Sequence, residues 1–304
     1  MIKTGIASSS ALGPLLIRLL LSHPDVSIAW VAGPNPRLDL VYDELAGEIP
    51  PVATDPDWDN TDLYIGPWTE QLHRRLTSDG SSLKAILTGP DDSIAHYDSE
   101  TAALGVAEFN RKTFVRTGRI ALRPHAVTLL GALALMPLAK NLLLQGRISG
   151  TAIIPGPRTA GASLRVGGAP LDGKTFLQLT DSILTQLQNS FSATFRILPV
   201  YNQASSFASA TFGLDINMPA DEIERLYTQF YHDHRHIVVT HREITEAMVH
   251  GTNKSIISLR ACPDERRLWV TVAFDAEYKA GAGNIIHLLN LLFGLDERTG
   301  LAPL

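Results

Sequence analysis

Short apolar runs alternate with longer amphipathic stretches in the first third of the chain. The apolar runs are rich in Ile, Val and Leu and are bounded by turn-forming residues, which is typical of buried strands. Strands are therefore predicted over residues 2–7, 26–31, 63–66 and 83–88. Helical periodicity predicts helices through Leu21 and over residues 69–75. A strand, a small-residue turn and a helix in this order indicate a βαβ unit and a parallel sheet with helices on its faces.

The longest apolar helical pattern covers residues 129–144 and follows a proline, Pro124. A proline at its start and Lys140 near its end suit the direction of a helix dipole. The pattern therefore predicts a buried helix whose first turn can face a cleft, which is a place for a nucleophile or an anion. The side chains available there are His125, Ala126 and Thr128.

The second half of the chain has more strand character than the first. Runs rich in Val, Ile, Phe and Thr predict strands over residues 150–154, 193–200, 208–217, 237–240, 255–261 and 268–274. Amphipathic patterns predict helices over residues 176–188, 221–231 and 284–292. Residues 50–62 and 155–173 are expected to be loops, residues 263–266 a hairpin turn, and residues 101–111 irregular or helical.

The length and composition are those of an ordinary two-domain globular protein. The chain has 304 residues, 45% hydrophobic and 19% charged, with a net charge of −5. Such a charge gives no reason to expect nucleic acid or an anionic membrane as a partner. No run of about 18 apolar residues lacks polar breaks, so no membrane span is expected. Cys262 is the single cysteine; it excludes an intrachain disulfide and fits a cytoplasmic location.

The turn after the first strand is poor in glycine. In a dinucleotide-binding fold, glycines at this turn let the backbone approach a pyrophosphate at the start of the first helix. Here Ser8, Ser9 and Ser10 stand in the turn and only Gly13 remains. Two interpretations stay open, a turn that binds nothing and a cofactor loop. Arg37 could likewise meet a 2′-phosphate or simply be solvated.

Histidines supply two further candidates. His232, His234, His236 and His241 are close in sequence, but they lack the spacing of a zinc site, so no metal is predicted and a solvated loop is favoured. His125 could act as a substitute base beside Ala126. A structural or capping role is the favoured interpretation, because its side chain leaves the helix start in a different direction.

The C-terminal part carries the most specific motif. Gly251-Thr252-Asn253, the stretch from Asp275 to Gly283 and the sequence NLLFGLDERTGL at residues 290–301 together resemble the end of N-acetyl-gamma-glutamyl-phosphate reductase. Residues 17–26 and 105–111 are similar to elements of the same family, in the same order. The resemblance therefore covers nearly the whole chain.

This resemblance implies an α/β fold of two domains. The first is a Rossmann-like parallel-sheet domain over residues 1–125, completed by the terminal helix in 284–304. The second, over residues 126–283, is a glyceraldehyde-3-phosphate dehydrogenase-like α/β domain for dimerisation and substrate. The family cofactor is NADP, and the family usually forms homo-oligomers. The family's cofactor-binding positions fall on Ser8, Ser10, Gly13, Lys279, Gly283 and Asn284.

The resemblance also places the family's reaction. That reaction needs a cysteine at the start of the central helix, as a thiolate nucleophile, and a histidine as general acid and base. The cysteine position is Ala126, and Arg196 is the counterpart of the histidine, in a segment whose register is uncertain. No histidine occurs between Ala126 and Tyr231. No catalytic residue of the family is therefore intact. Because losing one nucleophile of a covalent mechanism costs on the order of 10⁶ in rate, little or no reductase activity is expected.

Two functional interpretations follow. The first is a catalytically inactive relative of the reductase with a binding or regulatory role, possible partners being copies of itself and an active paralogue in hetero-oligomers. The second is an active NADP-dependent oxidoreductase that uses other residues. Saturable stabilisation by NADP(H) would favour the second. The cofactor stays unknown, because the glycine-rich turn is eroded. Restoring Cys at Ala126 and His at Arg196 is expected to give no useful activity, since the turn at Ser8 to Ser10 is also altered.

Overall fold

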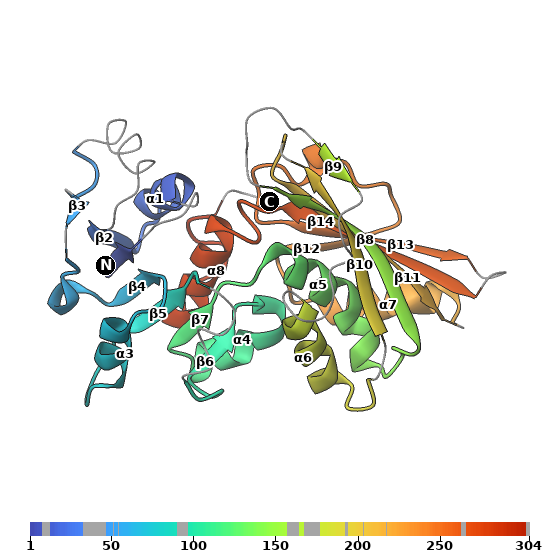
Figure 1. Cartoon of the computed structure of the whole chain (residues 1–304), viewed down its shortest axis with the longest axis horizontal. Helices are drawn as coiled ribbons and strands as arrows, with labels where there is room; N and C mark the ends of the chain where they lie inside the picture. The colour runs from blue at the N-terminus through green and yellow to red at the C-terminus, as the bar shows by residue number, and fades with distance from the viewer. Residues whose placement is uncertain are drawn as a thin grey trace. The chain divides into compact units, whose positions relative to one another are not determined.

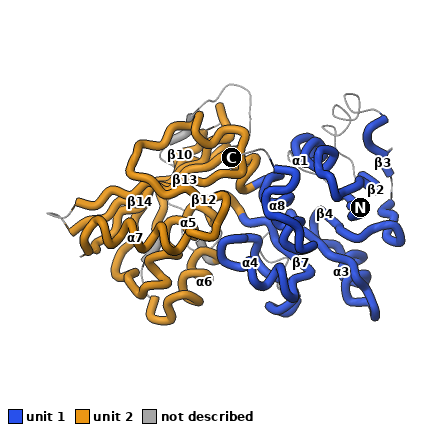
Figure 2. The backbone as a smooth tube through the Cα atoms, turned by 180° about the vertical axis from the view of Figure 1, so that it is seen from behind, with its two compact units in different colours: residues 1–124, 281–303 blue, residues 125–280, 304 orange. Residues whose placement is uncertain are grey.

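The chain divides into two compact units (Figures 1 and 2). The first consists of Met1–Pro124 and Gly281–Pro303, and the second of His125–Ala280. The computed structural model describes residues 1–7, 13–32, 47–50, 52–53, 55–89, 97–156, 164–166, 177–191, 194–202, 204–216, 218–262 and 266–301. In this part of the chain, no helix has both the length and the apolar character needed to cross a membrane.

The first unit is built on a parallel sheet with the strand order β3-β2-β1-β4-β5-β7-β6. Its strands are β1 (Ile2–Ala7), β2 (Val26–Ala32), β3 (Val52–Ala53), β4 (Leu63–Gly66), β5 (Lys84–Leu87), β6 (Ala102–Leu104) and β7 (Ile120–Leu122). Its helices are α1 (Gly13–Leu21), α3 (Glu70–Thr77), α4 (Ala107–Arg116) and α8 (Ala282–Phe293), with a 3₁₀ turn at Trp58–Asn60. The strand order reverses between β1 and β4. In open α/β sheets such a reversal marks where ligands bind, beyond the carboxyl ends of the strands.

The terminal helix α8 belongs to the core of this first unit. It packs against α1 and α4, and its apolar side chains join those of β1, β4 and β5 in one buried cluster. All of its residues except the last are buried. It ends at Gly294, which has a φ of +68° and so adopts the left-handed conformation that suits glycine at a helix end. The chain therefore returns to the first unit after completing the second.

Two expectations for the first unit were wrong in part. Residues 50–62 contain β3 and the 3₁₀ turn, and residues 101–111 contain a strand, β6, before α4 begins. Both strands have only two or three residues, which is too short for the sequence to show an alternating pattern. The turn with Ser8, Ser9 and Ser10 lies outside the described residues, as does Arg37.

The second unit has a mixed sheet with the strand order β12-β13-β14-β11-β8-β10-β9. Its strands are β8 (Arg147–Pro155), β9 (Leu164–Val166), β10 (Thr194–Asn202), β11 (Phe207–Asp215), β12 (Ile237–Thr240), β13 (Ser255–Cys262) and β14 (Arg267–Asp275). Its helices are α5 (Ala126–Lys140), α6 (Leu177–Leu187) and α7 (Ala220–Tyr231), with a 3₁₀ turn at Glu246–Met248. β13 and β14 form the predicted hairpin. The strand β9 interrupts the stretch 155–173 that was expected to be a loop.

The central helix α5 is buried on all sides from Ala126 to Ala139. It ends at Lys140, earlier than the apolar pattern suggested, because Asn141 caps it and Leu142 turns into a left-handed conformation with a φ of 59°. Pro137 lies inside the helix and has no N–H for the carbonyl of Leu133, four residues earlier. The hydroxyl of Tyr231 on α7 donates to this carbonyl at 2.6 Å. A helix with an internal proline is thus completed by a neighbouring helix.

The two faces of the second sheet differ. Helix α5 contacts β8, β11 and β14, and α7 contacts β12 and β13. Alternate residues of these strands, such as Ile148, Phe212 and Val270, are completely buried on the helix-covered side. The opposite face carries partly exposed apolar side chains, among them Leu198 at 42%, Val238 at 41% and Trp269 at 39%. This second face is called the open face below.

Candidate functional site

Ala126 is the first residue of α5, where the first turn presents backbone N–H groups. His125 precedes it as the N-cap residue with extended backbone angles, φ −70° and ψ 151°. Its Nδ1 accepts the N–H of Val127 at 3.2 Å. The capping role expected for His125 is therefore confirmed. Protonation of Nδ1 would remove this cap, because the same lone pair is needed for both.

The start of α5 offers no nucleophile. Ala126 is 8% exposed and contributes a methyl group, which can neither attack a carbon nor carry a proton. Thr128 is completely buried, and its carbonyl accepts a hydrogen bond from the Thr180 hydroxyl at 3.3 Å. The sequence-based expectation of a buried helix preceded by proline holds at this end of α5, and the atom that would do covalent chemistry is absent from it.

Arg196 lies on the open face of the sheet. It is exposed and pairs with Ser149 of β8, whereas its neighbour Ile197 is completely buried on the helix-covered side. Successive side chains of a strand point to opposite faces, so Arg196 points away from α5. The structure does not bring Arg196 and Ala126 together. On the side of α5, the strand presents Ile197 and Pro199, which carry no titratable proton.

Cys262 does not replace the missing thiol. It is the last residue of β13 and pairs with Arg267 across the hairpin. It lines a cavity of about 380 Å³ together with Pro219 and Ala220 at the start of α7, and no residue of α5 lines this cavity. The single thiol is thus placed at the hairpin end of the sheet.

The predicted cofactor positions at the C-terminal end divide between the two units. Lys279 is completely buried in the second unit, and its backbone N–H donates to the carbonyl of Asp275 at 2.7 Å. The Asp275 carboxylate accepts from the backbone N–H groups of Gly251 at 2.9 Å and Glu277 at 3.0 Å. Asp275 therefore orders the loop before β13. Gly283 and Asn284 belong to the first turn of α8 in the first unit.

Asn284 has an enclosed acceptor without a donor. Its side chain is 1% exposed, and its Nδ2 donates to the carbonyl of Gly105 at 3.1 Å. Its Oδ1 is buried and has no hydrogen-bond partner. Leaving such an acceptor unsatisfied costs about 1–3 kcal/mol, so each case needs a physical reason. A ligand with an N–H donor, such as a carboxamide, would satisfy it.

Glycines permit close backbone approach near this position. A Cβ on Gly105 would lie 2.7 Å from the carbonyl oxygen of Leu122 and 2.6 Å from Cδ1 of Leu288. A Cβ on Gly66, at the end of β4, would lie 2.6 Å from the carbonyl oxygen of Ala7 at the end of β1. The two strands at the reversal point are therefore close at their carboxyl ends. Strand order, Gly66 and Asn284 together fit a dinucleotide at this edge, while Gly13 starts α1 beside it.

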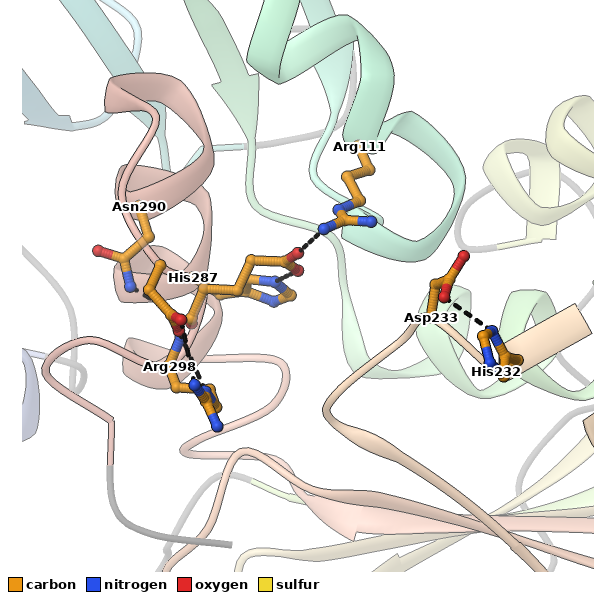
Figure 3. Close-up of polar contacts among 8 residues, drawn as sticks. Arg111, His232, Asp233, His287, Asn290 and Arg298 are labelled. Carbon is orange, nitrogen blue, oxygen red and sulfur yellow. Dashed lines mark hydrogen bonds and ion pairs between the residues drawn. The ribbon is translucent and has the colours of Figure 1, made fainter.

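Two further polar residues of α8, His287 and Asn290, follow Asn284 along the helix and take part in polar contacts (Figure 3). His287 is 2% exposed, and its Nε2 lies 2.7 Å from Oε2 of Glu297. The other carboxylate oxygen of Glu297 lies 2.5 Å from the guanidinium of Arg111 on α4. Burial by itself raises the pKa of Glu297, but the hydrogen bond and charge of His287, with the charge of Arg111, outweigh burial and lower the pKa. Glu297 is therefore held as a carboxylate between two cations or donors.

The second of these residues is Asn290. Its Oδ1 lies 2.9 Å from Nε2 of His23, and its Nδ2 donates to the carbonyls of Glu297 at 3.3 Å and Thr299 at 2.8 Å. Nδ1 of His23 accepts the N–H of Asp25, so the ring proton resides on Nε2 and points at Asn290. Periodicity in the C-terminal motif does not predict this network, because polar residues on a buried helix carry no pattern that identifies their partners.

The histidines 232–241 do not converge. His232 lies 2.7 Å from Asp233, and His241 lies 2.9 Å from Glu224, whose hydrogen bond raises the pKa of His241. His236 is 2% exposed, which corrects the expectation of a solvated loop; it directly precedes β12 and is carried into the packed layer with that strand. Among the residues that the structure describes, no group of three His, Cys, Asp or Glu side chains could hold a metal ion.

Comparisons with known proteins agree on fold and relatives. Proteins named N-acetyl-gamma-glutamyl-phosphate reductase from Parabacteroides distasonis and Flavobacterium johnsoniae are 27% and 28% identical to the chain, over 99% of this chain and 98% of each relative. No protein-family model matches the chain. The solved structure of aspartate semialdehyde dehydrogenase II from Vibrio cholerae superposes with a TM-score of 0.67 at 13% identity, covering 97% of this chain and 98% of that one. The expected two-domain α/β fold is confirmed.

Proposed function

We propose that this chain, a full-length homologue of the N-acetyl-gamma-glutamyl-phosphate reductases, is catalytically inactive as a reductase and has a binding or regulatory role. The observation that carries the proposal is Ala126 at the first residue of α5. The fold, the helix start and its cap are intact, whereas the side chain there has no nucleophilic atom. A covalent mechanism without its nucleophile loses on the order of 10⁶ in rate.

The remaining chemistry around α5 supports the same proposal. The Nδ1 lone pair of His125 is engaged by Val127, Arg196 points to the open face, and Cys262 lies at the hairpin end. No described side chain on the helix-facing side of β10 at Ile197 or Pro199 can move a proton. An acyl phosphate bound near Ala126 would therefore meet no thiolate from these positions.

The ligand that the first unit fits best is a nicotinamide dinucleotide, by the reversal of strand order, the close approach at Gly66 and the buried, unpaired Oδ1 of Asn284. When bound, such a cofactor supplies a hydride. Asn284 would accept the carboxamide N–H, and Gly105 would hold the Asn284 amide in place. This fit also favours the second candidate function, an active NADP-dependent oxidoreductase that uses non-standard residues.

Binding and turnover must therefore be measured separately. We expect NADPH to stabilise the wild-type chain saturably in a thermal-shift titration and to quench Trp fluorescence with the same midpoint. We expect no oxidation of NADPH with N-acetyl-gamma-glutamyl phosphate. Turnover above the uncatalysed rate would refute the inactive assignment and support the oxidoreductase. Absence of NADPH binding up to millimolar concentration would remove the dinucleotide from both.

A reconstruction separates the loss of the nucleophile from other losses. Ala126→Cys is expected to give a thiol that reacts with iodoacetamide but no reductase turnover, because Arg196 stands at the position of the family's general acid and base and points to the open face. Ala126→Ser, with a similar volume and a weaker nucleophile, is the matched control. Reductase activity in Ala126→Cys alone would show that the remaining machinery is complete and that a single substitution accounts for the loss.

We also propose that the chain acts as an oligomer through the open face of the second sheet. The face carries Leu198 on β10 and Trp269 on β14, and a Thr211–Thr271 hydroxyl pair at 3.0 Å joins β11 to β14 on the same face. Partly exposed apolar residues among small polar ones are typical of an interface core. We expect sedimentation of wild-type protein as a dimer or larger species and of Leu198→Glu as a monomer. Co-expression with a cysteine-bearing homologue tests for hetero-oligomers by co-purification.

A further inference from the structure

The terminal helix α8 is apolar except for one stripe. Asn284, His287 and Asn290 are spaced by three residues, so they lie on one side of the helix, and each is at most 2% exposed. The residues between them are Ile285, Ile286, Leu288 and Leu289, and all four pack into the core. Apolar packing tolerates small rotations and shifts of a helix more readily than hydrogen bonds do. The stripe is therefore what specifies the rotation and depth of α8.

Two of the three polar side chains are anchored to their surroundings. Asn290 is held by His23 and by the carbonyls of Glu297 and Thr299, and His287 is held by Glu297, which Arg111 holds in turn. The third polar side chain is Asn284, which lies one turn nearer the helix start. Its Oδ1 is buried and has no hydrogen-bond partner. The anchored residues His287 and Asn290 thus lie on the C-terminal side of Asn284, the residue proposed to contact the ligand.

Two polar contacts link α8 to α4 and to the residues just before it. Nδ2 of Asn284 reaches the carbonyl of Gly105, two residues before α4, and His287 reaches Arg111 within α4 through Glu297. The Glu297 carboxylate bridges Arg111 of α4 and His287 of α8, two residues that Figure 3 labels. Loss of the lower link would leave Asn284 to set the position of the helix start alone.

We propose that Glu297 is a positioning residue, which fixes α8 through His287 and so places the Asn284 amide for the carboxamide end of a bound dinucleotide. This inference rests on the dinucleotide binding proposed above. It assigns no chemistry to Glu297 itself, whose carboxylate contacts only protein groups. It also offers a reason why a carboxylate stands at this position. Burying a carboxylate costs desolvation free energy, so burial by itself does not favour one there.

The test measures NADPH affinity in a double-mutant cycle of Glu297→Ala and Asn284→Ala, with fluorescence titration for binding and thermal unfolding for stability. We expect Glu297→Ala to weaken NADPH binding about 10-fold in the wild-type background, as expected for coupled neighbours. In the Asn284→Ala background we expect no further weakening, whereas the loss of thermal stability persists. Glu297→Gln, which keeps hydrogen-bonding groups of the same shape, is expected to retain most of the affinity.

Two controls separate positioning from general destabilisation. Arg298→Ala removes an exposed ion pair with Asp296 beside the network and should change neither readout. Thr69→Ala removes the N-cap of α3, whose hydroxyl accepts from Leu72 at 3.1 Å, and should lower stability without changing NADPH affinity.

The inference is overturned if folded Glu297→Ala binds NADPH like the wild type, or if Glu297→Ala weakens binding equally with and without Asn284. Should Glu297→Ala not fold, the same cycle with Arg111→Ala decides, because this variant removes the ion pair that holds Glu297. Equal weakening of NADPH binding by Arg111→Ala with and without Asn284 then counts against positioning. Failure of the wild-type chain to bind NADPH refutes the proposed dinucleotide binding, and the positioning role with it. These outcomes are distinguishable because the wild-type titration is independent of every variant.

Discussion

Replacing Tyr231 by Phe tests how a proline is accommodated in the middle of the central helix. Pro137 leaves the carbonyl of Leu133 without its helical N–H donor, and the Tyr231 hydroxyl at 2.6 Å takes the donor's place. Tyr231→Phe keeps the ring and removes only this oxygen. The Leu133 carbonyl then lies in a completely buried helix without a donor.

The loss in unfolding free energy depends on whether the carbonyl keeps another hydrogen-bond donor. A hydrogen bond contributes about 0.5–1.5 kcal/mol net, and a buried acceptor left without a partner costs about 1–3 kcal/mol. Tyr227 provides the control, because its hydroxyl donates at 2.5 Å to Ala134, whose carbonyl can still be met by the backbone N–H of Leu138. We therefore expect Tyr231→Phe to cost about 2–3 kcal/mol and Tyr227→Phe about 1 kcal/mol.

Urea unfolding followed by far-ultraviolet circular dichroism measures both costs, with linear extrapolation to water. The decisive comparison adds Pro137→Ala, which supplies an N–H at position 137 and should reduce the cost of Tyr231→Phe to about 1 kcal/mol. Equal costs for the two tyrosines, or a cost of Tyr231→Phe that Pro137→Ala leaves unchanged, would refute the reasoning. Unchanged m-values across the set are needed for the comparison, since they show that the same surface unfolds.

Three further outcomes follow from single contacts. His125→Ala should lower the unfolding free energy by about 1 kcal/mol and His125→Asn by much less, because asparagine also caps; equal losses in chemical denaturation would contradict the cap. Gly105→Ala should cost about 1–3 kcal/mol, since its Cβ meets the Leu122 carbonyl at 2.7 Å, and a melting temperature within a degree of wild type would count against that. The pKa of the Glu297 carboxyl is lowered below the ordinary 4.5, so the stability that the carboxylate contributes is present above pH 4.5 and lost as the pH falls through the folded-state pKa. The difference in unfolding free energy between wild type and Glu297→Gln should shrink as the pH falls, and a constant difference would exclude this contribution.

The sequence predicted the longer strands and helices of both units because their patterns are regular. The apolar run before Lys140 could not be misread, since a helix of this length without polar positions must be buried. The run did not reveal where α5 ends, because Asn141 and the left-handed Leu142 act through backbone geometry rather than through hydropathy. β6 was missed for a different reason, since three residues paired to β7 carry too little periodicity.

The candidate site was less predictable than the fold. A shift of one residue in a strand moves a side chain to the opposite face, so the uncertain register near Arg196 decided whether that residue points toward α5 or away from it. The structure places it on the open face. Partners distant in sequence were equally hidden, as in the contact of Asn284 with Gly105, 179 residues apart. Hydropathy reports burial but not which polar groups meet.

The C-terminal motif and the start of α5 explain how resemblance to the reductases and the proposed loss of their chemistry can coexist. Asn290 and Glu297 are tied into hydrogen bonds that hold α8 in the first unit, so changing them would leave buried polar groups without partners and destabilise the fold. Ala126 has no such constraint. Alanine is the best helix former, and the cap of α5 comes from His125 rather than from residue 126. A nucleophile can therefore be lost there without cost to the fold, while the motif at the other end of the chain is held by its buried hydrogen bonds. The presence of that motif reports the fold, and the residue at position 126 reports the chemistry.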